Sequence, residues 1–161
     1  MAVQKLIIIS GSPCVGKTTV ADCLLGQLKN AAHFDGDWAW CVNPFSLSDP
    51  RLRNGDKNVS FVLSTYLKSD FDYVIHSNVV MGYEDIRAPI LQDITAADYE
   101  IIGVSLTCSE QTLTERHKKR GDSGEVDFQW LRHKPYPNDY VINTDGKTVE
   151  EIVDEIKTII L

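Results

Sequence analysis

The stretch GSPCVGKTT, from Gly11 to Thr19, has the residue types and the spacing of a phosphate-binding loop. It matches the pattern G-x-x-x-x-G-K-[ST] and stands between an apolar run and an amphipathic one. Glycines in such a loop let backbone N–H groups converge on an anion, and the helix that follows adds the positive end of its dipole. The residues expected to contact the phosphates of a nucleotide are Gly11, Ser12, Pro13, Cys14, Val15, Gly16, Lys17, Thr18 and Thr19.

Two side chains of this loop have specific chemistry. Lys17 is expected to reach the β- and γ-phosphates as a point charge and so to take part in catalysis, and the Thr18 hydroxyl is expected to bind Mg²⁺. The alternative is a glycine-containing turn that carries Lys-Thr by chance. The loop therefore predicts a site for a nucleoside triphosphate, and it leaves the reaction open.

The rest of the chain limits which classes of reaction are possible. A GTPase needs the base-reading pattern N-K-x-D, and the nearest stretch, NTDG at 143–146, lacks the lysine. A motor ATPase usually carries an acid at the end of its third strand, where this chain has Ser77 and Asn78. A small phosphotransferase is the class that remains.

The stretch FDGDW supplies two carboxylates, Asp35 and Asp37, at the end of a short predicted strand. Phosphoryl transfer needs a group that accepts or orients the proton of the attacking hydroxyl. We assign Asp37 to this role and Asp35 to Mg²⁺, directly or through water, and we expect both to lie at the acceptor substrate. The alternative is a solvated acidic turn, which Asp-Gly favours.

The stretch ERHKKRGD places Arg116 and Arg120 four residues apart on one helix face. Arginines neutralise the charge that spreads over a transferring phosphoryl group, so both are expected at the nucleotide and in catalysis. The alternative is a solvated helix end that complements the helix dipole, which we assign to Lys118 and Lys119. Residues 117–134 are expected to form a lid that excludes water, with Arg132 as a further candidate at the substrate.

Segment 38–53 is expected to line the acceptor pocket, and its aromatic residues suit a small ring-bearing or amphipathic acceptor. Its arginines could meet a carboxylate or a phosphate. The candidates are Trp38, Trp40, Asn43, Phe45, Arg51 and Arg53, with Asn78 and Arg87 as weaker ones. The alternative is that the tryptophans only pack beneath this segment. His33, His76, His117 and His133 share no metal-ligand spacing, and we interpret them as structural.

Alternating strands and helices must position these residues. Strands are predicted at 3–9, 31–34, 71–77, 100–107 and 140–143, and helices at 17–29, 58–69, 83–94, 109–121 and 147–160. Pro89 is expected to end or kink its helix, and Asn54-Gly55 to interrupt regular structure. Strands that alternate with helices predict a parallel α/β sheet covered on both faces, with ligands at the carboxyl ends of the strands.

Composition limits the class of protein. The 161 residues suit one domain, and a net charge of −7 argues against long nucleic acid as a partner. The four cysteines show no zinc-ligand spacing and are expected to be reduced, as in the cytoplasm. No run is apolar for long enough to span a membrane, and no signal peptide is recognisable, so we expect a cytoplasmic protein, either a monomer or a homodimer.

GSPCVGKT, FDGDW, VIHSN and LTERHKKRGD together resemble the shikimate kinase and gluconate kinase branch of phosphate-loop small-molecule kinases. LTERHKKRGDSG and DYVINTDGKTVEEIVDEI are similar to chloramphenicol phosphotransferase. The resemblance implies a three-layer P-loop NTPase fold with strand order 2-3-1-4-5, ATP with Mg²⁺ and a small closing lid. It implies that Asp35 and Asp37 serve Mg²⁺ and the acceptor hydroxyl, and that Arg116 or Arg120 contacts the adenine or its phosphates. It also places Asn143 and Thr144 beside the adenine.

The sequence therefore predicts, over residues 1–161, an ATP-dependent kinase that phosphorylates a hydroxyl of a small molecule. Two alternatives stay open: a nucleoside, nucleotide or nucleic-acid end kinase, and a non-catalytic ATP-binding regulatory module.

Overall fold

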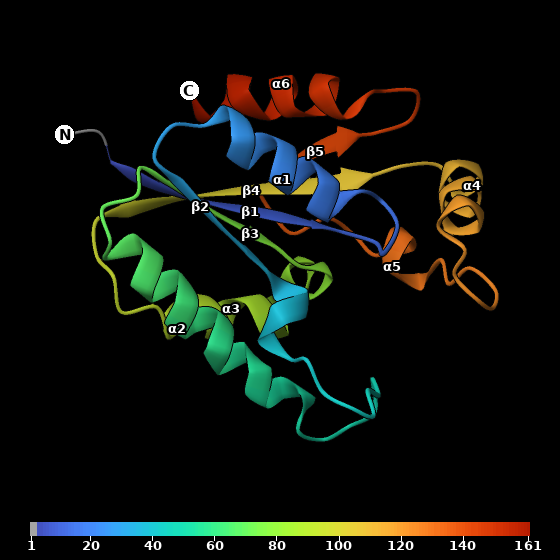
Figure 1. Cartoon of the computed structure of the whole chain (residues 1–161), viewed down its shortest axis with the longest axis horizontal. Coiled ribbons are helices and arrows are strands. Elements are labelled where there is room, and N and C mark those ends of the chain that lie inside the picture. Colours follow the sequence, from blue (N-terminus) through green and yellow to red (C-terminus); the bar gives the residue numbers. More distant parts are fainter. Residues whose placement is uncertain (1–2) are drawn as a thin grey trace.

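Residues 3–161 are described by a computed structural model, in which five strands form one parallel sheet (Figure 1). The strands are β1 (Gln4–Gly11), β2 (Ala31–Asp35), β3 (Tyr73–Ser77), β4 (Tyr99–Thr107) and β5 (Tyr140–Asn143). Their order across the sheet is β2-β3-β1-β4-β5, and every neighbouring pair is parallel. The order implied by the family resemblance is confirmed.

Helices cover both faces of the sheet. They are α1 (Lys17–Gln27), α2 (Gly55–Leu67), α3 (Glu84–Gln92), α4 (Glu110–Arg120), α5 (Gln129–Arg132) and α6 (Val149–Ile160). In Figure 1, α1 and α6 lie on one face and α2 and α3 on the other, while α4 and α5 lie beyond the carboxyl ends of the strands. Short 3₁₀ helices follow β2 (η1, Gly36–Ala39), precede α2 (η2, Leu52–Asn54) and follow β3 (η3, Val79–Gly82).

The central strand β1 explains why two layers of helix are needed. Its residues Leu6 to Ile9 are fully buried, and their side chains alternate between the two faces. Ile7 and Ile9 pack into the core beneath α1 and α6, whereas Leu6 and Ile8 pack into the core beneath α2 and α3. An uninterrupted apolar strand is therefore the expected sequence for the middle of this sheet.

Two helices differ from the sequence predictions. Helix α2 begins at Gly55, three residues before the predicted start, because Gly55 takes helical angles (φ −63, ψ −21). A Cβ on Gly55 would lie 3.1 Å from the Ala39 carbonyl oxygen, so a glycine lets α2 pack closely against η1. Helix α3 does not end at Pro89 but continues to Gln92, and the Pro89 carbonyl accepts a hydrogen bond from Asp93 N at 3.1 Å.

Helix α4 lies within its predicted range, 109–121, and is capped at both ends. The Ser109 hydroxyl accepts a hydrogen bond from Thr112 N at 3.1 Å, and the chain leaves the helix through Gly121 at φ +79. Helix α6 carries a capping box between Thr148 and Glu151. In residues 3–161 no helix combines the length and the apolar character that crossing a bilayer requires.

Candidate active site

The predicted phosphate-binding loop joins β1 to α1 in a conformation that only a few residue types accept. Gly11 has φ +144 and Gly16 has φ +105, and Cys14 also has a positive φ of 66. A Cβ on Gly11 would lie 2.5 Å from the Leu106 carbonyl oxygen, so glycine is required there both for its φ angle and for the close approach of β4. The loop therefore turns around a point at the N-terminus of α1, where N–H groups can converge on an anion.

Lys17 closes this loop. Its Nζ donates a hydrogen bond to the Ser12 carbonyl oxygen at 2.8 Å. Burial lowers the pKa of the Lys17 ammonium to about 8, although the nearby carboxylates of Asp37 and Asp35 act to raise it. A phosphate group at the loop would supply the negative charge that this buried ammonium lacks.

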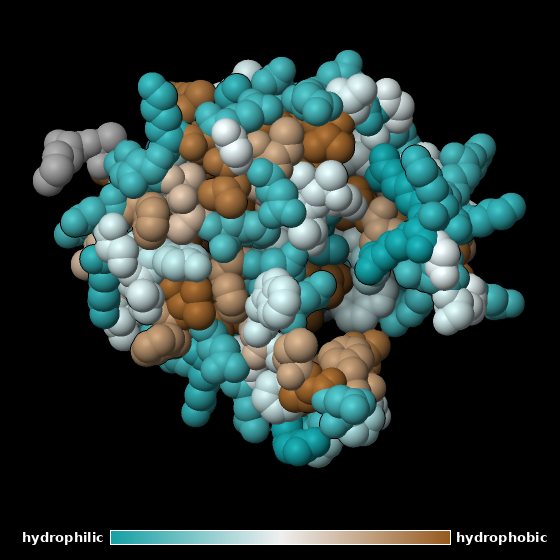
Figure 2. Space-filling view, in the orientation of Figure 1, coloured by the Kyte–Doolittle hydropathy of each residue, from teal (hydrophilic) through white to brown (hydrophobic). Residues whose placement is uncertain are grey.

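A cavity of ≈ 980 Å³ opens over the loop, and it is strongly cationic. Five of its lining side chains carry positive charge and two carry negative charge. They are Lys17, Arg116, Lys119, Arg120 and Lys147, with Asp35 and Asp37. In Figure 2 a hollow lies between the body of the molecule and the hydrophilic side chains in the region of α4. A polyphosphate matches this balance of charge. We call this space of ≈ 980 Å³ the nucleotide cavity.

Thr18 and Asp35 meet at one edge of the nucleotide cavity. Thr18 Oγ1 donates a hydrogen bond to Asp35 Oδ2 at 2.6 Å, and Asp35 Oδ1 accepts one from Asp37 N at 2.9 Å. A hydroxyl and a carboxylate are hard oxygen ligands that suit Mg²⁺, which usually keeps several waters and substrate phosphates as its other ligands. The residues present therefore fit an ion whose remaining ligands are waters and the phosphates of a nucleotide.

Asp37 and Asn78 lie beside this pair. Gly36 lets them approach, because a Cβ there would lie 2.3 Å from Asn78 Nδ2. Asn78 Oδ1 accepts a hydrogen bond from Val80 N at 3.3 Å and so begins η3. Both side chains line the nucleotide cavity, as does Trp38, which is 73% exposed.

The two predicted arginines of α4 both reach the nucleotide cavity, with different attachments. Arg116 Nη1 donates to the Val15 carbonyl at 3.1 Å and to Thr144 Oγ1 at 2.9 Å, and its Nη2 donates to the Thr144 carbonyl at 3.2 Å. Arg116 therefore ties the phosphate-binding loop to the segment after β5. Arg120 is exposed, and its Nε lies 3.4 Å from an Asp122 oxygen.

Some predicted residues lie away from this cavity. Arg132 points to α4, where its Nε donates to Glu110 Oε1 at 2.6 Å, so it would need a movement of the lid to meet a substrate. Asn143 Oδ1 accepts a hydrogen bond from Asp145 N at 2.8 Å, and Thr144 is fully buried beneath Arg116. Neither Asn143 nor Thr144 is among the lining residues, and their contact with adenine stays a prediction.

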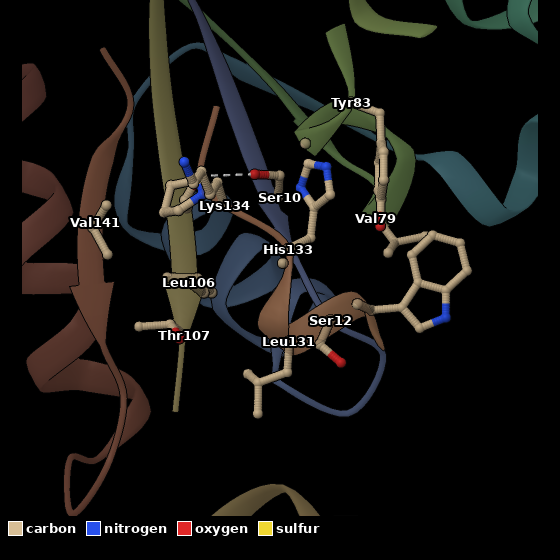
Figure 3. A pocket seen from close by; sticks show the side chains of 15 residues that line it. Ser10, Ser12, Val79, Tyr83, Leu106, Thr107, Leu131, His133, Lys134 and Val141 are labelled. Carbon is tan, nitrogen blue, oxygen red and sulfur yellow. Dashed lines mark hydrogen bonds between the residues drawn. The ribbon is translucent and has the colours of Figure 1, made fainter. Parts of the chain in front are cut away.

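Gly11 and Ser12 line a separate cavity of ≈ 100 Å³ beside the carboxyl ends of β1 and β4 (Figure 3). Ser10 and Ser105 both line it, with their Oγ atoms 3.1 Å apart. Tyr83, which follows η3, and His133, which follows α5, also line it, and Figure 3 shows their rings side by side. Of the phosphate-binding loop, only Gly11 and Ser12 line this cavity, whereas Pro13 to Thr19 line the nucleotide cavity.

A third cavity, of ≈ 330 Å³, borders the predicted acceptor segment. Most of its lining comes from η1, segment 40–53 and the start of α2, and it shares Asp37, Asn78 and Val79 with the nucleotide cavity. We call it the η1–α2 cavity. Asp37 thus stands between a cationic space and a second, smaller one.

The arginines considered for an anionic acceptor all have carboxylate partners. Arg51 Nη2 lies 2.9 Å from Asp49 Oδ2, and Arg53 Nη1 lies 3.5 Å from Asp56 Oδ1. Arg87 lines neither the nucleotide cavity nor the η1–α2 cavity. It is 3% exposed, pairs with Asp139 at 2.9 Å and lies 3.7 Å from the centre of the Tyr136 ring. The Asp139 carboxylate is the partner that the buried guanidinium requires, and a contact between Arg87 and an acceptor stays a prediction.

Two further cations line the nucleotide cavity. The sequence predicts Lys119 at a solvated helix end, and no sequence pattern singles out Lys147. The i, i+3 spacing from Arg116 was the available signal for Lys119. His33 bridges Asp22 Oδ1 at 3.1 Å and Ser77 Oγ at 2.9 Å, and Ser77 lines the same cavity. No local pattern reveals that contact, because it joins β2 to the end of β3.

Comparison with known proteins agrees with this geometry. A family model described as "AAA domain" matches residues 7–129. The fold is shared with the Mycobacterium tuberculosis APS kinase in complex with AMPPNP and APS, at 16% identity and a TM-score of 0.72, over 99% of each chain. It is also shared with shikimate kinase from Aquifex aeolicus, at 20% identity and a TM-score of 0.65, over 96% of this chain and 95% of that one.

A third similar structure is the tunicamycin resistance protein of Deinococcus radiodurans, at 16% identity and a TM-score of 0.71, over 98% of this chain and 95% of that one. A search of curated proteins finds no match. The resemblance to phosphate-loop kinases is thereby confirmed at the level of fold.

Proposed function

This chain belongs to the AAA-domain family, and from that premise we propose that it transfers the γ-phosphate of ATP to a hydroxyl group of a small molecule. One observation carries the proposal: Asp37 lines both the nucleotide cavity and the η1–α2 cavity. A carboxylate between a donor space and an acceptor space is the arrangement that phosphoryl transfer to a hydroxyl requires. The fold, which APS kinase and shikimate kinase share, supports the same reaction class.

The residues divide the work as follows. The loop N–H groups and Lys17 would hold the β- and γ-phosphates, and Thr18 and Asp35 would hold Mg²⁺. When bound, Mg²⁺ neutralises charge on the phosphate oxygens. Asp37 accepts a hydrogen bond from the acceptor hydroxyl and aligns its oxygen with the γ-phosphorus.

In the transfer step the hydroxyl oxygen forms a bond to the γ-phosphorus, and the bond from that phosphorus to the β–γ bridging oxygen breaks. ADP leaves with the electron pair of the broken bond, and Asp37 accepts the hydroxyl proton. Arg116 and Arg120 neutralise the charge that spreads over the transferring oxygens. Asn78, which lines both cavities, and Trp38, which lines the nucleotide cavity, contact the acceptor.

Asp37→Asn tests the proposal, because asparagine keeps the size of the side chain and removes the proton acceptor. Wild type should release ADP with at least one alcohol from a panel of hydroxylated metabolites, antibiotics and nucleosides, and mass spectrometry should find the phosphorylated product. The variant should lose about 10²- to 10⁴-fold in turnover while it binds ATP almost normally.

Asp154→Asn is the matched control, since Asp154 is an exposed carboxylate on α6, and it should leave turnover unchanged. Transfer that survives Asp37→Asn would remove the catalytic assignment. If wild type binds ATP and phosphorylates nothing in the panel, the chain is an ATP-binding regulatory module. If the products are nucleotides or nucleic-acid ends, it is a kinase of that class. The cytoplasmic location and the monomeric or homodimeric state stay predictions.

A further inference from the structure

The η1–α2 cavity has an apolar lining, unlike the nucleotide cavity that it adjoins. Its walls carry Trp40, Phe45, Leu47, Leu52, Val59 and Val80. Its volume of ≈ 330 Å³ lies at the lower end of the range for small-ligand pockets, which is about 300–1,000 Å³. The space can therefore hold one compact apolar group beside the Asp37 carboxylate.

The charges around this cavity exclude an anionic ligand. Its charged lining residues are one cation, Arg53, and two carboxylates, Asp37 and Asp56. Arg53 already lies 3.5 Å from Asp56, so no unpaired cation lines the space. A carboxylate or phosphate entering it would lose its hydration and gain only a repulsive neighbour in Asp37.

Trp40, one of the lining residues, carries an unsatisfied polar group. The indole Nε1 of Trp40 is buried, and it has no hydrogen-bond partner. A buried N–H without an acceptor is unfavourable, so a ligand oxygen that reached it would be stabilised there. A neutral ligand that carries a hydroxyl or carbonyl oxygen besides the reacting hydroxyl satisfies this requirement.

The outer wall of the cavity is an exposed apolar segment. Phe45 is 58% exposed and Leu47 is 68% exposed, on the same irregular stretch between η1 and η2. Figure 2 shows apolar side chains gathered over this stretch, at the lower right of the molecule. Apolar side chains beside a partly open cavity lose exposed area when an apolar ligand arrives, which stabilises that complex.

We propose that the η1–α2 cavity is the acceptor subsite and that it selects an uncharged alcohol with an aromatic or other compact apolar body. The apolar body packs between Trp40, Phe45 and Leu47, and the reacting hydroxyl lies at Asp37. This inference rests on the proposed function, and it separates this chain from kinases whose acceptors carry a carboxylate or a phosphate.

Two probes that share one carbon skeleton test the selection. 3-Phenyl-1,2-propanediol is neutral, and 3-phenyllactate replaces its terminal CH₂OH with a carboxylate. Their affinities are measured by calorimetry or by saturation-transfer NMR on the full chain without ATP. The diol should bind more tightly than 3-phenyllactate, by a factor of about 10 or more. Glycerol, which lacks the apolar body, should bind more weakly than both. Equal affinities, the reverse order or no binding of the diol would each overturn the proposal.

Variants locate the binding. Phe45→Ser and Leu47→Ser, at exposed positions that the fold tolerates, should each weaken binding of the diol by about 3- to 10-fold. Trp40→Phe keeps a ring and removes the N–H, and it should weaken binding by about 5-fold. Phe61→Ser is the matched control, because Phe61 is 74% exposed on α2 and does not line this cavity. Equal effects at Phe45 and Phe61 would contradict the location.

Asp56→Asn tests the role of the paired charges in the lining. It frees Arg53 from its carboxylate partner, so 3-phenyllactate should gain about 5- to 10-fold relative to the diol. An unchanged ratio would contradict the role given to this pair. Because binding is measured without ATP, the subsite and the transfer reaction can fail separately. If the chain phosphorylates only anionic alcohols, the proposed function holds and the proposed subsite is refuted. If the chain binds the diol but transfers no phosphate to any alcohol, the proposed function is refuted.

Discussion

Thr18 Oγ1 donates a hydrogen bond of 2.6 Å to Asp35 Oδ2, which joins the first turn of α1 to the end of β2. The two residues are 17 positions apart in the sequence, and the sheet order brings them to one edge. This contact places the hydroxyl of the phosphate-binding loop beside the first carboxylate of the D-x-D stretch. A metal ion that entered with ATP, as proposed, would meet two oxygen ligands from two different elements.

The metal assignment predicts the effect of Asp35→Asn. Loss of the carboxylate charge should weaken ATP binding in the presence of Mg²⁺ by roughly 10-fold or more, by analogy with removal of a group at a metal site. ATP binding without a divalent ion should change less. Titration of ATP with and without Mg²⁺, with Asp154→Asn as control, measures this difference. An unchanged enhancement by Mg²⁺ would remove Asp35 from the metal site.

Lys17→Met should weaken ATP binding by roughly 10- to 100-fold, because a charge-assisted hydrogen bond is worth about 1.5–3 kcal/mol. It should not reduce the stability of the free protein, since burial lowers the pKa of Lys17 to about 8 and thus disfavours its charged form. Calorimetric titration and thermal unfolding give the two readouts. Lys118→Met changes an exposed lysine on α4 and should alter neither.

Substitution by lysine should have different effects at Arg116 and at Arg120. Arg116→Lys loses the fork that holds Val15 and Thr144, so unfolding should become easier by about 1–2 kcal/mol and ATP binding should weaken. Arg120→Lys should slow turnover and change the free energy of unfolding by less than about 0.5 kcal/mol, because Arg120 is exposed. Urea unfolding and steady-state kinetics test the contrast, and equal losses of stability would refute it.

The stability of the fold should depend strongly on both partners of the buried pair of Arg87 and Asp139. Asp139→Ala leaves the Arg87 guanidinium buried without a carboxylate and should destabilise the fold by about 3–5 kcal/mol. The double change Arg87→Met with Asp139→Leu removes both charges and should recover most of that loss. Chemical denaturation of wild type and the two variants decides this, and a double variant as unstable as the single one would contradict it.

His76 predicts an acid-sensitive stability. Burial lowers the pKa of His76 to about 4, more than the hydrogen bond to the Phe34 carbonyl raises it. The folded chain keeps His76 neutral, whereas the unfolded chain takes up a proton near pH 6.5. The contribution of neutral His76 to the free energy of unfolding is therefore complete above pH 6.5. It is lost as the pH falls towards about 4, which lowers the free energy of unfolding by on the order of 3 kcal/mol.

His76→Asn keeps a donor for the Phe34 carbonyl and cannot titrate, so its free energy of unfolding should change less between pH 6.5 and 4 than that of wild type. His117→Asn on α4 serves as the control. The same acid slope in wild type and His76→Asn would show that another group is responsible. Denaturation at a series of pH values supplies the measurement.

The sequence by itself determined the features that depend on neighbours along the chain. The loop from Gly11 to Thr19, the buried strand β1 and the capped helix α4 follow from backbone conformations and apolar spacings that local residue types impose. Alternation of strands and helices also predicts a parallel sheet, and therefore the edge at which the carboxylates of Asp35 and Asp37 lie.

Only the tertiary structure decided how those residues are shared between sites. It placed Asp37 between two cavities, added Lys147 to the nucleotide cavity, and paired Arg87 with Asp139 outside both cavities. The physical reason is that net charge in a pocket, burial and pairing depend on which distant segments meet, and local sequence patterns carry no information on that.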